Sequence, residues 1–370
     1  MTDRVLLLSA NFGSGHTQAA RAAAEAFRSS GSNWAEAVEI DHPLLSLVSS
    51  GYLRLLDWAP RAYRTLYHAP VGRPARLAVR AAYTALVKRE IERTQPTLVL
   101  ATHPFPAAAA AHLRRRGRLK APLAVVMSDF VPHPLWVAPG VDRYCLPSDW
   151  AAEKMLALGA PSGALHVTGI PIGRGFGRAA EAGGNRTSPH VLAMGGGLGL
   201  GPLVEAVRSV AALPHPDLRV TVVCGRNETL RSEMEDLFGD DPRVTLLGFT
   251  SEIPALMARS SLLITKPGGL TCSEALAAHL PILLLRPLPG HEEENAAYLT
   301  GTGAALLESS EEQIGPLTAS LLYGEPSRLA RMRAAAQTLA RPDAAASIAA
   351  ALKGEPGLPE VGHRPVARVI

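Results

Sequence analysis

The sequence of 370 residues has few cysteines, no long apolar run and little net charge. Its three cysteines, Cys145, Cys224 and Cys272, are far apart and lack the spacing of a zinc site or a disulfide framework, as is typical of a reducing compartment. No stretch reaches the roughly 18 apolar residues of a membrane span. The apolar residues 5–8 lead into a glycine loop and not into a signal-peptide cleavage site. We therefore expect a protein on the cytosolic side of the membrane.

The formal net charge of +4 conceals an uneven distribution. Residues 1–180 contain 21 Lys and Arg against 12 Asp and Glu, whereas residues 181–370 contain 16 against 21. A hydrophobic share of 47% and a charged share of 19% exclude a disordered chain. The sequence thus combines a basic half and an acidic half, and the chain is long enough for a core in each.

Apolar runs alternate with helical stretches in both halves, a pattern typical of parallel βαβ units. In the first half we predict strands near residues 4–10, 36–41, 97–101, 123–128, 143–146 and 165–168. In the second half we predict strands near residues 190–194, 219–224, 243–247, 261–264 and 282–285. The fold class is therefore α/β, with two doubly wound, Rossmann-like domains facing each other across a cleft. The predicted division is a domain at 1–170, a linker at 171–188, a domain at 189–352 and a loose tail at 353–370.

The first candidate site is a glycine loop at residues 9–17, between a predicted strand and a predicted helix. Gly13 and Gly15 let a ligand approach the backbone closely, and a helix N-terminus favours negative charge. The loop lacks the dinucleotide-binding fingerprint, because Gln18 stands where the third glycine would be. His16 at the mouth of the loop is a candidate general base, and the alternative is that it only caps the helix or fills a turn.

A second glycine loop, at residues 194–201, follows the first predicted strand of the second half. Its backbone N–H groups suit a diphosphate. Tight strand–helix packing would account for two of its five glycines, but not for all of them. Gly196, Gly197 and Gly199 are therefore candidate contacts of a diphosphate.

Polar residues also follow two later strands of the second half, at 265–271 and 289–295. Open α/β sheets bind ligands at the carboxyl ends of their strands. Glu274, about one and a half turns into its helix, suits a ribose diol. The side chains of His291, Glu292 and Asn295 suit sugar hydroxyls, while acidic residues at 292–294 are equally favourable as charges at a helix N-terminus.

These motifs together resemble a known family. They are the Gly-Ser-Gly-His loop, Ser-Asp-Phe at 128–130 followed by His-Pro-Leu-Trp at 133–136, the glycine loop at 195, Cys-Gly-Arg-Asn at 224–227, and residues 266–271 through 289–295. In this order, over roughly residues 4–350, they resemble the monogalactosyldiacylglycerol synthases and processive diacylglycerol glucosyltransferases. These enzymes are relatives of the peptidoglycan N-acetylglucosaminyltransferase that makes lipid II. The resemblance is specific for the superfamily and less specific for the sugar and the acceptor.

The resemblance implies a GT-B fold that binds a UDP-sugar mainly with the second half and a lipid acceptor with the first. His16 corresponds to the family's glycine-loop histidine, which is implicated in acceptor activation, and Gly13, Gly15 and His133 would belong to the acceptor loops. On the donor side the resemblance implies diphosphate contacts from the glycine loop and from Lys266, Gly268, Gly269, Leu270 and Thr271. It implies uracil contacts from Phe249 and Thr250, ribose contacts from Glu274, and hexose contacts from His291, Glu292 and Asn295. The family commonly has Gln where His291 stands, which leaves the sugar open.

Transfer with inversion from an α-linked UDP-sugar needs a base for the acceptor hydroxyl and a stabilised diphosphate leaving group. His16 is the first candidate base. Asp129 is the second, either as the base or as the residue that orients His16, and its alternative role is that of a cap or turn residue. No Asp-x-Asp metal motif follows a predicted strand, so we expect helix N-termini, backbone N–H groups and Lys266 or Arg226 to stabilise the diphosphate. No metal or other cofactor is expected beside the UDP-sugar, which is a co-substrate.

Residues 51–90 contain eight basic residues against two acidic ones, and five of the eleven Trp and Tyr residues, among them Tyr83. Cationic side chains interleaved with aromatic ones are typical of a helix that docks on anionic lipid. The alternative is a solvated helical face with ordinary core aromatics. No nucleic-acid-binding module is recognisable, so no nucleic-acid partner is expected.

We predict a metal-independent UDP-hexose transferase that acts on diacylglycerol or a similar glycerolipid, in glycolipid biosynthesis. We expect it to be peripherally associated with the inner face of the cell membrane. Two alternatives stay open: a UDP-sugar transferase with a polyprenyl-linked or other hydrophobic acceptor, and a nucleotide-sugar-binding protein without turnover.

Overall fold

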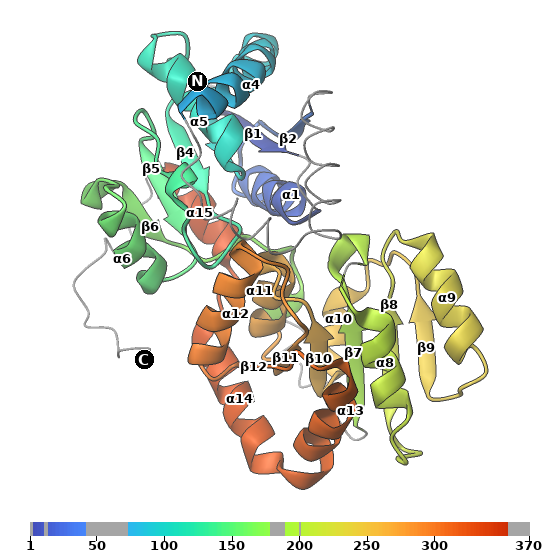
Figure 1. The fold of residues 1–370 in the computed structure, drawn as a ribbon. Helices are drawn as coiled ribbons and strands as arrows, with labels where there is room; N and C mark the ends of the chain where they lie inside the picture. Colours follow the sequence, from blue (N-terminus) through green and yellow to red (C-terminus); the bar gives the residue numbers. More distant parts are fainter. Residues whose placement is uncertain (1–2, 11–13, 42–72, 178–188, 200, 354–370) are drawn as a thin grey trace. The chain divides into compact units, whose positions relative to one another are not determined.

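The computed structural model describes residues 3–10, 14–41, 73–177, 189–199 and 201–353. Their contacts divide the described chain into two compact units (Figure 1). The first unit contains the described residues up to 173 together with 289–291 and 343–353. The second contains the described residues of 174–288 and 292–342. Most of the predicted linker, from residue 178 to residue 188, lies outside the described residues.

The first unit is built on a six-stranded parallel sheet in the order β2-β1-β3-β4-β5-β6. Its strands are β1 (Arg4–Ala10), β2 (Trp34–Ile40), β3 (Leu98–Ala101), β4 (Leu123–Val126), β5 (Arg143–Leu146) and β6 (Leu165–Val167). Because β2 lies on one side of β1 and β3 on the other, the sheet has a topological switch point between β1 and β3. All six strands were predicted, with bounds that differ by no more than two residues.

Helices cover both faces of this sheet. The α-helices are α1 (Ser14–Ser29), α4 (Arg73–Thr94), α5 (Pro104–Arg115), α6 (Asp149–Ala157) and α15 (Ala344–Lys353), with short 3-10 turns at Pro134–Trp136 and Ser162–Ala164. Alternation along β1 sorts its side chains between the faces: Leu6 and Leu8 pack in a core with α4, α5 and α6, and Val5 and Leu7 in a core with α1 and α15. The sheet is therefore buried on both faces, as parallel sheets usually are.

The last described helix, α15, packs in the first unit, although the sequence interpretation counted residues up to 352 with the second domain. Its Ile348 and Ala349 are buried in the core that contains Val5 and Leu7, and α15 lies against α1 (Figure 1). The guanidinium of Arg143 on β5 donates to the carbonyl oxygen of Ala351. The apolar face of α15 thus completes a core that is built largely from the start of the chain.

The second unit has another six-stranded parallel sheet, in the order β12-β11-β10-β7-β8-β9. Its strands are β7 (His190–Met194), β8 (Arg219–Val223), β9 (Val244–Leu247), β10 (Leu262–Thr265), β11 (Ile282–Leu284) and β12 (Ala305–Leu307). The switch point lies between β7 and β10. β12 was not predicted from the sequence.

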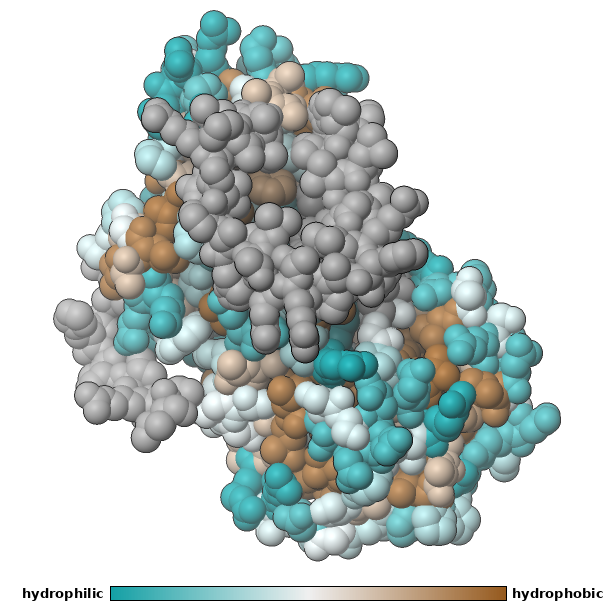
Figure 2. All heavy atoms as spheres, in the orientation of Figure 1, coloured by the Kyte–Doolittle hydropathy of each residue, from teal (hydrophilic) through white to brown (hydrophobic). Residues whose placement is uncertain are grey.

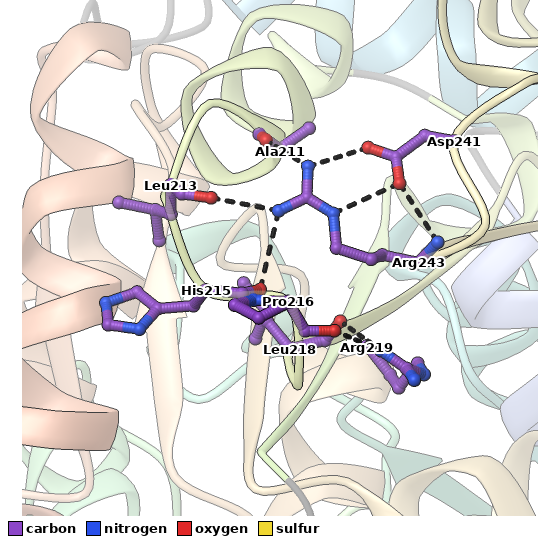
Figure 3. A network of polar contacts seen from close by, with 8 residues as sticks. All are labelled: Ala211, Leu213, His215, Pro216, Leu218, Arg219, Asp241 and Arg243. Carbon is purple, nitrogen blue, oxygen red and sulfur yellow. Dashed lines mark hydrogen bonds and ion pairs between the residues drawn. The ribbon is translucent and has the colours of Figure 1, made fainter.

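The helices of the second unit are α8 (Leu203–Ala211), α9 (Glu228–Phe238), α10 (Ile253–Arg259), α11 (Gly269–Ala277), α12 (His291–Gly301), α13 (Glu311–Ala319) and α14 (Pro326–Leu339), with a 3-10 turn at Gly196–Leu198 and a π-helical turn at Ser320–Gly324. Arg243, just before β9, secures the C-terminal end of α8. Its guanidinium donates to the carbonyl oxygens of Ala211 and Leu213 and pairs with Asp241 (Figure 3). These bonds satisfy carbonyl groups that a helix end leaves without partners.

The prediction of two doubly wound α/β sheets is confirmed. No helix of the described chain is long and apolar enough to cross a membrane. On the face of the second unit seen in Figure 2, hydrophobic side chains form separate patches among hydrophilic ones.

Only the end of the predicted membrane-binding segment 51–90 falls within the described chain. One of its aromatic residues contradicts the lipid-facing interpretation: the side chain of Tyr83 is 1% exposed and packs against the ring of Phe105. Tyr83 is a core residue, because it lies on the face of α4 that covers the sheet.

Candidate functional site

The first candidate site lies at the carboxyl ends of β1, β3 and β4, beside the switch point of the first sheet (Figure 1). Open α/β sheets bind ligands at such points. His16 is in the first turn of α1, which begins at Ser14, within the segment 9–17 that was predicted to be a loop. Gly15 lies in the same turn, and Gly13 is outside the described residues.

The imidazole of His16 is held through its Nδ1 atom. Nδ1 lies 2.9 Å from the carbonyl oxygen of Thr102 and 2.6 Å from the hydroxyl oxygen of Ser128. A carbonyl oxygen can only accept, so Nδ1 carries the proton and Ser128 Oγ accepts from the same N–H group. In this tautomer Nε2 has a free lone pair, as a general base requires.

Thr102 holds His16 at two points. Its backbone carbonyl accepts from the ring, and its side-chain Oγ1 donates to the backbone carbonyl of His16 at 3.0 Å. Thr102 directly follows β3 and is fully buried, and its own amide donates to Leu8 on β1. The ring position is therefore fixed by the sheet.

Electrostatics keep the imidazole neutral. Burial lowers the pKa of His16 below its ordinary value, and the negative charge of Asp129 offsets part of this shift. The ring of His103 lies edge-on to that of His16, with 4.7 Å between their centroids. Burial holds the pKa of His103 well below the usual range, and a proton on the neighbouring His16 would lower it further. Both imidazoles are therefore uncharged at neutral pH.

The two other predicted residues of this region have different surroundings. Asp129 lies in the bend after β4 and is partly buried, within electrostatic reach of His16. The cap of the following 3-10 turn is His133, whose Nδ1 accepts from the amide of Leu135 at 3.2 Å. The cap role considered for Asp129 thus belongs to His133.

Sequence reasoning missed Thr102 and His103, and it gave Ser128 no role of its own. The sequence did indicate their position: Thr102 and Ser128 stand directly at the ends of predicted buried strands, where side chains of open α/β sheets contact ligands. Their distance from His16 along the chain hides the relationship, because they are 86 and 112 residues away from it.

The second candidate site surrounds the glycine loop after β7 in the second unit. Two glycines lock this loop against the turn after β8. Gly199 has φ +58°, and a Cβ atom there would lie 2.7 Å from the carbonyl oxygen of Cys224. Gly225 has φ +63°, and its Cβ would lie 2.7 Å from the carbonyl oxygen of Gly197. The amide of Arg226 donates to the same Gly197 oxygen at 3.2 Å. Glycine is thus required here for backbone conformation and close packing.

Lys266, directly after β10, borders the glycine loop. A Cβ atom added at Gly196 would lie 3.9 Å from its Cε. The ammonium group pairs with the carboxylate of Glu292, which is 1% exposed, and the other carboxylate oxygen accepts from the amide of Leu288 at 3.0 Å. This buried carboxylate holds a partly exposed cation beside the loop.

The first turn of α11 is the second anion-binding candidate after the glycine loop. Its N-cap residue is Gly268, which has no side chain to bond the first amides of the helix. Gly269, Leu270 and Thr271 form this first turn. The side-chain amide of Asn295, which is fully buried, donates to the carbonyl of Pro267 at 3.2 Å and so supports the turn from α12.

Glu274 lies on α11, one turn beyond this N-terminus. Its carboxyl group has no hydrogen bond among the described residues, and burial raises its pKa to about 8. A carboxyl group in this state is poised to ionise when donors reach it, as ribose hydroxyls do. His291 is the first residue of α12, and its contact with a hexose stays a prediction.

Phe249 and Arg226 form an aromatic–cationic pair at the ends of β9 and β8. The guanidinium carbon of Arg226 lies 4.6 Å from the centroid of the Phe249 ring, and Phe249 is 60% exposed. An exposed ring backed by a guanidinium suits stacking with a flat base. Thr250 Oγ1 accepts from the amide of Glu252 at 3.1 Å, which shapes the turn before α10.

Among the described residues, no group of three or more His, Cys, Asp or Glu side chains could hold a metal ion. The cysteines Cys145, Cys224 and Cys272 are free and buried.

Two family models match the chain, one on each half. Residues 16–172 match the monogalactosyldiacylglycerol (MGDG) synthase model, and residues 190–348 match the C-terminal domain of glycosyltransferase family 28. Each half of the chain thus matches a glycosyltransferase family model. The resemblance and the enzyme class predicted from the motifs are therefore confirmed.

Full-length relatives agree with these matches. The chain is 29% identical over 384 aligned positions to a processive diacylglycerol beta-glucosyltransferase of Bacillus cereus (strain AH187), covering 98% of this chain and 96% of the relative. The fold resembles MurG of Acinetobacter baumannii, with a TM-score of 0.64, 19% identity and coverage of 95% and 99% of the two chains. It also resembles a UDP-GlcNAc 2-epimerase of Neisseria meningitidis bound to UDP-GlcNAc, with a TM-score of 0.60, 16% identity and coverage of 95% and 100%. The predicted GT-B fold is confirmed.

Proposed function

We propose that the chain transfers a hexose from a UDP-sugar to the free hydroxyl of diacylglycerol or a similar glycerolipid, with inversion and without a metal ion. The observation that carries this proposal is the His16 imidazole, neutral and held by Thr102 so that Nε2 has a free lone pair. A neutral alcohol acceptor needs such a base, because its hydroxyl is a weak nucleophile until its proton is removed.

The reaction is a single displacement at the anomeric carbon. Nε2 of His16 takes the proton of the acceptor hydroxyl while the acceptor oxygen forms its bond to that carbon. The bond between the carbon and the UDP oxygen breaks, and its electron pair leaves with UDP. The imidazolium that forms keeps its Nδ1–H bond to the Thr102 carbonyl and is stabilised by the negative charge of Asp129. A positioned base of this kind contributes about 10²–10⁴-fold in rate.

Three features of the second unit support a UDP-sugar donor. The glycine loop and the uncapped first turn of α11 offer backbone N–H groups to the diphosphate, and Lys266 adds a cation beside them. The Glu274 carboxyl suits the ribose diol. The exposed ring of Phe249, with Arg226, suits the uracil.

The acceptor and the place of action are suggested by the relatives and by composition. The curated relative is named a diacylglycerol glucosyltransferase, and diacylglycerol resides in membranes. The basic and aromatic content of residues 51–90 supports peripheral attachment to the anionic inner face of the cell membrane.

The test uses the full chain with UDP-glucose and, separately, UDP-galactose. Each donor is incubated with vesicles that contain diacylglycerol and with vesicles that contain a polyprenyl phosphate, and the lipids are analysed by mass spectrometry. We expect a hexosyl-diacylglycerol with one of the donors, in the presence of EDTA as in its absence. Product only on the polyprenyl lipid would replace the proposed acceptor, and UDP binding without a lipid product would refute transfer to either.

A further inference from the structure

We infer that Ser128 is the positioning residue of the base: its hydroxyl fixes the orientation of the His16 ring, whose tautomer the Thr102 carbonyl sets. This inference rests on the proposed function for its catalytic meaning. It assigns to a hydroxyl the orienting role that sequence reasoning considered for Asp129.

The first argument is geometric. Ser128 Oγ lies 2.6 Å from Nδ1 of His16, closer than the Thr102 carbonyl oxygen at 2.9 Å. Ser128 Oγ also lies 3.4 Å from that carbonyl oxygen, to which it can donate. The hydroxyl therefore accepts from the ring and donates to the carbonyl, and the three groups form a closed set. A proton on Nε2 in place of Nδ1 would leave the Thr102 carbonyl facing a bare nitrogen.

The second argument is placement. Ser128 is 4% exposed and stands two residues beyond the end of β4, so the sheet fixes the position of its side chain. The hydrogen bonds of the His16 ring join three neighbouring segments, namely the start of α1, the end of β3 and the end of β4. A ring held from two strand ends loses little orientation when it accepts a proton.

The third argument concerns charge. Both partners of Nδ1 are neutral acceptors, in contrast to the carboxylate of a Ser-His-Asp triad, which stabilises the imidazolium. Three titratable groups act on the ring: the Asp129 charge raises the pKa of His16, the His291 charge lowers it, and His103 packs edge-on. Burial is the largest influence and lowers it. The base thus stays neutral and ready at pH values where an ordinary histidine is partly protonated.

The first experiment is ¹⁵N NMR of the full chain labelled on histidine, with His16 assigned from the spectrum of His16→Gln. In the wild type we expect a protonated Nδ1 and a bare Nε2. In Ser128→Ala the Thr102 carbonyl keeps Nδ1 protonated, and we expect the Nδ1 proton to exchange faster with solvent because the ring has lost one of its two partners. Ser128→Thr, which keeps the hydroxyl, should show the wild-type exchange rate. A wild-type exchange rate of this proton in Ser128→Ala would overturn the inference. This readout needs no substrate, so it stands whether or not the proposed acceptor is correct.

The second experiment measures kcat and KM for the same variants. For Ser128→Ala we expect kcat to fall about tenfold, the effect of one hydrogen bond that strengthens as the imidazolium forms, with KM for the UDP-sugar unchanged. Ser128→Asp should move the acidic limb of the kcat/KM profile to higher pH, and Asp129→Asn should move it to lower pH. The control is Ser30→Ala, which removes a hydroxyl bonded only to the backbone of Phe27 at the far end of α1. An Asp129→Asn variant that speeds exchange of the His16 Nδ1 proton while Ser128→Ala does not would transfer the role to Asp129.

Discussion

The backbone carbonyl oxygen of Thr102 accepts a 2.9 Å hydrogen bond from Nδ1 of His16, and the Thr102 hydroxyl donates to the backbone carbonyl of the same histidine at 3.0 Å. These two bonds place a neutral imidazole at the switch point of the first sheet. They convert a histidine in a glycine loop, which could be a simple helix residue, into a base with a defined tautomer. The chemistry proposed for the chain depends on this arrangement.

The pH profile of the reaction should reflect the burial of His16. The active form is the neutral imidazole, so kcat/KM falls as the pH drops through the pKa of His16. Because burial lowers this pKa below 6.5, activity should persist to a lower pH than an exposed histidine allows. The measurement is kcat/KM between pH 4.5 and 8 at constant ionic strength. An acidic limb at or above pH 6.5 would contradict the assigned surroundings of the ring.

Binding of UDP should release a proton near neutral pH. The pKa of Glu274 is raised to about 8, so at pH 7 the free protein carries this carboxyl mostly protonated. Hydrogen bonds donated by the ribose diol favour the carboxylate and lower that pKa. Calorimetry of UDP binding in buffers of different ionisation enthalpy measures the released proton. Glu274→Gln should abolish the release and weaken binding, and equal proton release by this variant would exclude Glu274 as its source.

The pair between Lys266 and Glu292 should contribute to stability. Glu292→Gln leaves the Lys266 ammonium without its carboxylate partner in a mostly buried place, and breaking such a pair costs about 3–5 kcal/mol. The matched control is Glu235→Gln, because Glu235 pairs with Arg231 on the exposed surface of α9 and such pairs contribute less than about 1 kcal/mol. Urea unfolding of both variants gives the comparison. Equal losses of unfolding free energy in the two variants would show that the buried pair stabilises the fold no more than the exposed pair does.

Alanine at Gly199 should damage the donor site through the backbone. The residue has φ +58°, and the new Cβ would lie 2.7 Å from the Cys224 carbonyl oxygen, so the two loops must separate. The left-handed conformation alone costs about 1–2 kcal/mol for a residue with a Cβ atom. We expect lower thermal stability and weaker UDP binding. Gly324→Ala is the control, since nothing lies within 4 Å of its added Cβ and it has no positive φ. A Gly199→Ala variant that binds UDP with wild-type affinity would show that this loop is not part of the donor site.

The sequence predicted most of the fold because its buried strands are short apolar runs bounded by turn residues. β12 escaped prediction because its side chains are not a buried apolar run: only Ala305 is buried, and Leu307 is 41% exposed. The composition of α15 does not indicate in which of the two units this helix packs. The runs of alanine and Ile348 indicate a buried face, but they do not indicate in which core this face packs.

The candidate site was predicted in part. His16 was predicted as a site residue because a histidine is chemically unusual in a glycine loop. Glu274 was predicted because it follows the end of a strand. Glu292 was predicted to face a hexose, and the structure gives its buried carboxylate two other partners, Lys266 and the amide of Leu288. Ser128 could not be assigned a role from the sequence, because its relationship to His16 exists only once β1, β3 and β4 lie side by side.

The central claim is that His16 removes the proton of a lipid hydroxyl during hexose transfer. The most direct measurement is the single-turnover rate of hexosyl-diacylglycerol formation by the wild type and by His16→Ala, with UDP affinity measured in parallel. His112→Ala, which changes a partly buried histidine on α5, is the control. We predict a rate loss of about 10²-fold or more in His16→Ala, with UDP affinity within about twofold of the wild type. A His16→Ala variant that forms product at the wild-type rate would contradict the account.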